Sequence, residues 1–385
     1  MRMTRMHARG FSVVELLVSV AIGLLALIFA TRLITGSESS KQSALGGSDS
    51  MQNGMLAMFS ISGDAQQAGF GLNDPILVGC NTRFADNAGY MLAQAPRGAG
   101  TARPLAPAII ESNGSAPDLI SLYSGSSLTG TGTLRVVTDY IGGTRLNTDR
   151  QAYGFKEGDV VVVAPEDRTD DCALAQISRT PGTETFVMVA GGANFRYNRG
   201  ELGTNFKGSK ARVFNLGPAA SLSLHTWSVN NGFLRLRATD MAGAGAAPAT
   251  VADNIVSIKA QYGFDTRTGS AFANRTGLRV GSWSPTMIDA DADGVTGSAG
   301  DYEHIAALRI AVVARSKTRE RPAAGRTCTS TASRPTVFAS AEPAGVAPVS
   351  MAVDVAVAND STDWRCYRYR VFETVVALRN ADWKP

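Results

Sequence analysis

The chain of 385 residues has few of the side chains on which most enzyme mechanisms depend. It contains three histidines, His7, His225 and His304, and a Ser/His/Asp device must use one of them. His225 falls inside an apolar run and His304 opens another, which is typical of ordinary strand residues. The chain also has no G-x-G-x-x-G or G-K-[ST] phosphate loop between a strand and a helix. We therefore predict no catalytic residues and no enzyme activity.

Aromatic side chains make up only 7% of the chain, whereas glycine occurs 40 times and proline 15 times. This composition favours a β-rich, loop-rich body over a helical one. The chain also lacks a large excess of one charge, with 37 basic and 33 acidic residues. Such a balance does not support a nucleic-acid binder. Strand alternation explains the arginine- and tyrosine-rich cluster at 364–370, so no nucleic-acid partner is expected.

The most informative segment lies at the N-terminus. A leader with three arginines and no acidic residue ends at Gly10, and Phe11 opens an apolar stretch that contains one carboxylate, Glu15. A charged side chain within a membrane helix costs about 2.5–3.5 kcal/mol on insertion scales, so an acid kept there is usually functional. After a cut behind Gly10, Glu15 would stand near the free α-amino group of Phe11, its own or a neighbour's. Pairing offsets the desolvation of both groups, so Glu15 is the candidate assembly residue.

This arrangement resembles the class III leader of type IV prepilins, with Gly10 before the cut, Phe11 after it and Glu15 at the fifth mature position. The resemblance implies that an inner-membrane prepilin peptidase cleaves between Gly10 and Phe11, and that Phe11 is then N-methylated. An ordinary secretory signal is cut after its apolar region, whereas this cut precedes it, so the apolar segment is retained as an anchor. A plain signal anchor would leave Glu15 unexplained. Removing the leader's arginines also leaves 34 basic and 33 acidic residues, a net charge of +1.

The chain divides into four predicted parts. Residues 1–10 form the cleaved leader, 11–34 a transmembrane and assembly helix, and 35–70 the second half of the same helix. Residues 71–385 form a periplasmic head, whose middle region at about 90–250 is variable. The core apolar stretch within 11–34 is shorter than the about 20 residues that a span needs, so the whole range is required to cross a membrane.

The second half of the predicted helix carries Met51, Met55, Met58 and Phe59 at helical spacing. This pattern predicts one stripe buried in the core of the head. Glycines within the segment predict a bend or a break, and a Gly-Phe-Gly sequence predicts the end of the helix.

Short apolar or alternating runs separated by turns predict the strands of the head. They cover 118–124, 134–140, 159–164, 185–189, 211–215, 222–227, 233–238, 255–262, 304–315 and 370–379. The last two are expected to be neighbours in one antiparallel sheet, and 241–250 and 316–349 are expected to be irregular. We therefore assign the chain to the α+β class: a long N-terminal pilin helix, transmembrane in its first half, packed on a large, loop-rich antiparallel β head.

Four cysteines, Cys80, Cys172, Cys328 and Cys366, follow the anchor, and none belongs to a C-x-x-C or Cys/His metal motif. A head in an oxidising compartment with an even number of cysteines favours disulfides. Three connectivities are possible from the sequence. We favour Cys80–Cys172 and Cys328–Cys366, because each pair lies within the same half of the chain.

An aspartate-rich segment is the sharpest motif in the head. Asp289, Asp291 and Asp293 alternate before a turn glycine, as in the first half of an EF-hand calcium loop. The twelfth position is Gly300 where an EF-hand has glutamate, although Asp301 could close a non-standard loop. The alternative is a solvated acidic turn between strands, which we favour over calcium binding.

Local similarities at both ends of the chain narrow the resemblance to the PilW family of minor pilins. The similar residues are Met58-Phe59-Ser60, Ala68-Gly69-Phe70-Gly71, Tyr262-Gly263-Phe264-Asp265, the strand 307–315, Tyr369-Arg370-Val371-Phe372 and Leu378-Arg379-Asn380. The resemblance implies a minor pilin in a priming complex at the pilus tip, with other minor pilins, the major pilin and a possible tip adhesin as partners. It also implies a place in the inner membrane and later in the fibre.

Two other functions fit the sequence. A minor pseudopilin of a type II secretion system shares the leader, the anchor and the assembly logic. A pilin-anchored adhesin, or a periplasmic binding or hydrolytic module on a pilin stem, would use the poorly matched middle region.

Overall fold

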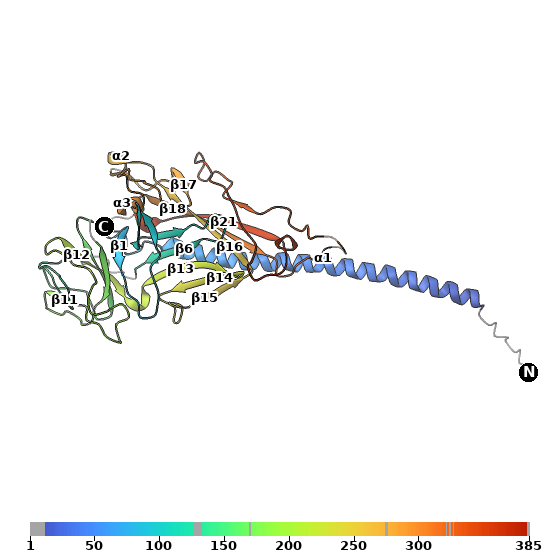
Figure 1. The fold of residues 1–385 in the computed structure, drawn as a ribbon, viewed down its shortest axis with the longest axis horizontal. Helices are drawn as coiled ribbons and strands as arrows, with labels where there is room; N and C mark the ends of the chain where they lie inside the picture. The colour runs from blue at the N-terminus through green and yellow to red at the C-terminus, as the bar shows by residue number, and fades with distance from the viewer. Residues whose placement is uncertain are drawn as a thin grey trace, which may run out of the picture.

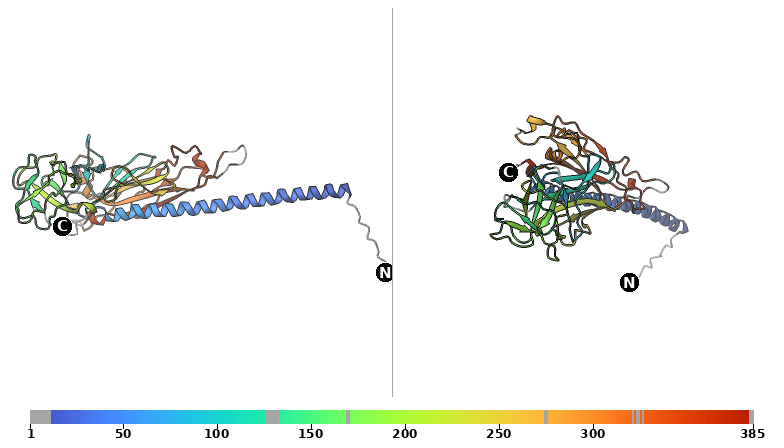
Figure 2. Two further views of the ribbon diagram at one scale, coloured as in Figure 1. Left: turned by 90° about the horizontal axis from the view of Figure 1, so that it is seen from below. Right: turned by 60° about the vertical axis from the view of Figure 1, so that its left-hand side comes forward.

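The computed structural model describes residues 12–125, 133–168, 171–273, 276–320, 322, 325 and 327–382. A single long helix, α1 (Val13–Gln67, 55 residues), projects from a β-rich head. Its C-terminal half lies along one side of the head, while its N-terminal half extends beyond it (Figure 1, Figure 2). This arrangement agrees with the predicted α+β class.

The glycines of α1 do not interrupt it, so the predicted break is wrong. Gly54 is needed for packing: a Cβ there would lie 2.0 Å from Cε2 of Phe372 on the last strand of the head. The helix ends where predicted, at Gln67, and the following Ala68 donates its N–H to the carbonyl of Asp64. Gly69 then adopts a φ of +84°, a left-handed conformation that favours glycine.

Two glycines of α1 form a matched test of this packing. Gly54→Ala is expected to lower the free energy of unfolding of the full chain by about 1–3 kcal/mol, because its methyl group meets the Phe372 ring. Gly63→Ala is expected to raise the free energy of unfolding by about 0.5–1 kcal/mol, since no atom lies within 4 Å of its Cβ position. Denaturant unfolding in detergent measures both. Equal effects of the two variants would contradict the close approach at Gly54.

In the described part of the head, the strands form three larger sheets and three two-stranded ones. The first sheet, in spatial order, comprises β4 (Pro104–Leu105), β1 (Cys80–Arg83), β10 (Cys172–Gln176), β9 (Asp159–Pro165), β12 (Ala211–Pro218) and β7 (Leu134–Arg135). The second comprises β15 (Ala249–Asp253), β14 (Phe233–Ala238), β13 (Ser223–Asn230), β6 (Leu119–Ser124) and β5 (Ala108–Glu111). The third comprises β17 (Ser282–Ser284), β16 (Ile255–Phe264), β18 (Ile305–Arg315) and β21 (Tyr369–Ala377).

The remaining elements are short. The small sheets pair β11 (Phe186–Met188) with β8 (Arg145–Asn147), β19 (Thr336–Val337) with β20 (Met351–Ala352), and β2 (Ala95–Arg97) with β3 (Gly100–Ala102). The short helices are α2 (Gly269–Ala273), α3 (Ala299–Glu303), α4 (Arg379–Asp382), η1 (Ala219–Ser221) and η2 (Trp364–Cys366).

The strands expected at 304–315 and 370–379 are β18 and β21, and they pair antiparallel over nine residues as predicted. One pair departs from the expected antiparallel head: β1 and β10 run parallel, with Thr82 opposite Cys172. The long chain segment between them supplies the crossover that a parallel pair requires. The strand expected at 134–140 shortens to β7, because only isolated bridges at Val136 and Tyr140 continue its pairing.

Strand alternation divides the head into separate hydrophobic clusters. In β9, Val160 and Val162 face the main core, which also receives α1, whereas Val161 and Val163 face a second cluster built from the middle of the chain. A fully apolar run such as β9 is the pattern of a strand covered on both faces. A third, smaller cluster lies under the segment after β18 and includes Phe338.

The structure joins Cys80 to Cys172 and Cys328 to Cys366, the favoured pairing. The first disulfide ties the two parallel strands β1 and β10 together. The second fastens the long segment after β18 to η2, directly before β21. Each disulfide closes a loop and thereby lowers the conformational entropy of the unfolded chain. In the chain-entropy model this stabilises the folded chain by about 4 kcal/mol.

Candidate functional site: the anchor helix and its junction with the head

Glu15 lies at the N-terminus of α1, where the backbone N–H of Ser12 donates to Oε2 of Glu15 at 3.2 Å. The Oγ of Ser12 in turn accepts the N–H of Val14 at 3.3 Å, so the two side chains form a reciprocal cap. Gly10 and Phe11 lie outside the described residues, and cleavage between them stays a prediction. The carboxylate of Glu15 thus lies at the N-terminal end of α1, beside the backbone of Ser12.

The first half of α1 has the length and composition of a membrane span. Val13–Ile34 covers 22 residues with a mean hydropathy of 2.7, and none of it is buried within the chain. A signal sequence near the N-terminus has the same properties. The exposed apolar surface needs a cover, either lipid or other helices.

Asp64 joins the second half of α1 to the head. Its Oδ2 lies 2.7 Å from Nδ1 of His225 and accepts the Nε1–H of Trp227 at 2.7 Å, both from β13. Nε2 of His225 lies 2.8 Å from Oδ1 of Asp240. Burial alone would lower the pKa of His225, but the hydrogen bonds to Asp240 and Asp64 raise it to about 9. The imidazolium therefore clamps the helix to the second sheet.

The same group does not form a catalytic triad. Ser223 Oγ lies 3.0 Å from Nε2 of His225, and Asp64 lies on the opposite ring nitrogen. Because Asp240 also contacts Nε2, both ring nitrogens donate to carboxylates and neither is free to accept a proton from Ser223. The geometry fits an electrostatic clamp.

The methionine stripe of α1 is not buried, and the prediction of a core stripe is wrong. Met51, Met55 and Phe59 are 46%, 54% and 77% exposed, and only Met58 is partly buried. The buried face of α1 is lined instead by small residues and one isoleucine: Ser50, Gly54, Ala57, Ile61 and Ala65. Small side chains allow the helix backbone to approach the sheet closely.

The polar alternation of 255–262 also has an unexpected outcome, because both faces of β16 are buried. Nζ of Lys259 donates to the carbonyls of Gly114 and Ala116 at 2.8 and 3.0 Å and to the carboxylate of Asp118. Both charged side chains of this ion pair are 0% exposed. Burial raises the pKa of Asp118, although Lys259 opposes the shift. The one charged side chain within this strand, Lys259, was the sequence signal for this pair.

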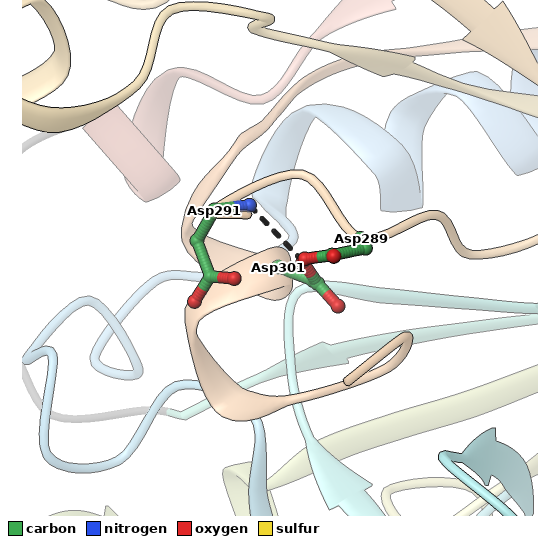
Figure 3. Close-up of side chains that lie close together, drawn as sticks. All are labelled: Asp289, Asp291 and Asp301. Carbon is green, nitrogen blue, oxygen red and sulfur yellow. Dashed lines mark hydrogen bonds between the residues drawn. The ribbon is translucent and has the colours of Figure 1, made fainter. Parts of the chain in front are cut away.

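The aspartate-rich loop brings together three of its four predicted ligands. One oxygen each from Asp289, Asp291 and Asp301 lies within 4.8 Å of the others, and Asp293 is not part of this group (Figure 3). Gly300 stands at the glutamate position because a Cβ there would lie 1.8 Å from Oδ2 of Asp291. The next residue, Asp301, places its carboxylate beside those of Asp289 and Asp291.

Hydrogen bonds already engage the central carboxylate of this loop. Oδ1 of Asp301 accepts the N–H groups of Ala290 and Asp291, and Oδ2 accepts those of Gly297 and Ser298 at 2.6 and 3.1 Å. These four donors match the about four acceptor sites of a carboxylate, which leaves little capacity for a cation. The geometry favours the acidic turn, and the calcium site stays a prediction.

Calcium titration followed by thermal melting tests the loop. We expect no change in the melting temperature of the full chain, because the carboxylate of Asp301 already organises the loop through backbone N–H groups. A calcium-dependent rise that Asp291→Asn abolishes would instead establish the site. Magnesium serves as the control for a general effect of divalent ions.

The comparisons with known proteins concern the C-terminal part of the chain. A family model described as PilW, Type IV Pilus-assembly protein W, matches residues 224–380. No curated protein and no solved structure matches the chain. The matched range contains His225 of the clamp and the strands β16, β18 and β21, on which α1 packs. Over residues 224–380 the chain is thus similar to the PilW family, and this match supports a PilW-family type IV pilus protein.

Proposed function

We propose that this chain is a minor pilin that takes part in the initiation of a type IV pilus, within a priming complex at the tip. The observation that carries the proposal is α1, which is apolar and uncovered over Val13–Ile34 and then packs into a head of the PilW family. A single rigid helix of this kind links a membrane anchor to a folded head.

The proposal assigns a role to each part of α1. The anchor holds the unprocessed chain in the inner membrane with the head in the periplasm, where the disulfides form. A prepilin peptidase removes the leader after Gly10, and Phe11 is methylated. The helix then packs beside those of other minor pilins and the major pilin, and the carboxylate of Glu15 pairs with an amine there. Neither an enzyme activity nor an organic cofactor is part of this function.

Deletion of the chain tests the proposal. The deletion strain should lose most of its surface pili, and re-expression of the intact chain should restore them. Normal pilus numbers together with a loss of protein secretion would contradict the proposal and support a pseudopilin. Normal numbers with loss of surface attachment alone would support an adhesin.

A further inference from the structure

The C-terminal half of α1 has one flank attached to the head and one flank bare. Asn53 donates to Asp253 of β15 at 3.3 Å, and Asp64 contacts His225 of β13. Successive residues of a helix are about 100° apart, which places Met51, Met55 and Phe59 on roughly the opposite flank. Their 46%, 54% and 77% exposure shows that nothing in the described part of the chain covers that flank.

Beside the bare flank lies a strand with a free edge. β21 pairs with β18 on one side through nine consecutive residues, without a register shift. Among the residues that the structure describes, no strand pairs with its other side. The burial of the two neighbours agrees with this, because ten of the eleven residues of β18 are buried but only Val376 of β21 is. The free edge of β21 contains no proline. An edge strand of this kind presents unpaired backbone N–H and C=O groups along its length.

The free edge of β21 and the bare flank of α1 lie next to each other, so one added strand could contact both. β21 lies against α1 (Figure 1). Its Phe372 ring fills the space over Gly54, and its Arg370 lies beside Gly47. Strands that add to a sheet lie about 4.8 Å from their neighbour. The next strand beyond β21 would therefore pass over the flank that carries Met51, Met55 and Phe59.

We propose that an extended strand of a second membrane-anchored pilin subunit adds to the free edge of β21 and covers this flank. The occupant follows from continuity, because the bare flank belongs to the same helix as the uncovered span Val13–Ile34. A subunit anchored beside that span brings its own head to the same height. This inference rests on the proposed function and names the contact through which that function works.

The edge also specifies the chemistry of the added strand. Its side chains toward α1 must be apolar where they lie over Met51, Met55 and Phe59, whereas the position opposite Arg370 lies beside Gly47, before that stripe. Arg370 is exposed, and no carboxylate among the described residues pairs with it. The added strand should therefore carry an acidic residue opposite Arg370, with main-chain hydrogen bonds supplying the remaining contacts.

Hydrogen exchange of the full chain in detergent, alone and copurified with each other pilin subunit of the same pilus, tests the proposal. Strand addition should slow the exchange of alternate amides of β21 about tenfold or more in one of these complexes. A complex that forms without added protection in β21 would overturn the strand addition and leave the proposed function intact. Failure to bind any pilin subunit would contradict the proposed function and the inference together.

Single substitutions locate the contact. Phe59→Glu places a charge on the bare flank without entering the core, and it should weaken the complex about tenfold or more. Ile141→Glu is the matched control, because Ile141 is 82% exposed and follows Tyr140, which belongs to the second hydrophobic cluster, in which no residue of α1 takes part. Equal affinities of the two variants would overturn the assignment of the flank. Circular dichroism of each variant confirms that the chain is folded.

Discussion

Replacement of Glu15 by alanine should leave the cleavage after Gly10 unchanged but lower the number of surface pili about tenfold or more. The carboxylate is the only acidic group in the exposed apolar segment Val13–Ile34. Its free energy in a low-dielectric setting depends on a cationic partner, and the amine of Phe11 is the natural one. On the proposed function, loss of the carboxylate removes the contact that sets the axial register of neighbouring subunits. Counting of pili by electron microscopy measures the effect.

A control separates assembly from helix stability. Loss of the cap that Glu15 forms with Ser12 costs about 0.5–2 kcal/mol of helix stability, and glutamine at position 15 retains much of this hydrogen bonding. Glu15→Gln should therefore fail in assembly like Glu15→Ala, because it lacks the charge. Ser19→Ala, on the same helix, should assemble normally. Normal piliation of Glu15→Gln would show that the residue acts as a cap only.

Replacement of Asp64 by alanine should lower the free energy of unfolding of the full chain by about 3 kcal/mol. The substitution leaves the imidazolium of His225 with one carboxylate and the buried indole N–H of Trp227 without its acceptor. Both losses act between α1 and β13, so the helix should detach from the head more easily. Denaturant unfolding measures the change. Glu157→Ala, which removes an exposed carboxylate of the head, should change stability by less than about 0.5 kcal/mol.

The clamp also predicts a pH dependence. The pKa of His225 rises from 6.5 to about 9 in the folded chain, so the protonated form is favoured by folding. Its contribution is complete below pH 6.5 and is lost as the pH rises through about 9. At about 1.4 kcal/mol per pKa unit, the shift corresponds to about 3 kcal/mol. Asp64→Ala should weaken this alkaline loss of stability. An unchanged pH profile in the variant would contradict the clamp.

Local features of the sequence predicted the parts of the fold that depend on local chemistry. The apolar segment predicted where α1 begins, and the glycine at position 69 predicted where it ends. Apolar and alternating runs predicted β16, β18 and β21. The orientation of α1 was not predictable in this way. Met51, Met55 and Phe59 form the more apolar stripe, yet the smaller face with Gly54 and Ala57 is buried, because close packing against β21 requires small side chains.

The residues of the candidate site also differ in how far the sequence predicts them. Glu15 could be found from the sequence, because an isolated charge in an apolar run is unusual by itself. The clamp could not, because Asp64 and His225 are 161 residues apart and neither stands in a recognisable motif. The acidic loop was found from the spacing of its aspartates. Whether it can bind a cation depends on backbone N–H groups that donate to the carboxylate of Asp301, which the sequence does not reveal.

The central claim is that this chain is processed and assembled as a pilin subunit. Mass spectrometry of the chain recovered from sheared, purified pili tests it most directly. We expect a mature chain that begins with N-methylated Phe11 and contains both disulfides. A chain that begins at Met1, one cut after Ala30, or the absence of the chain from the pilus fraction would contradict it.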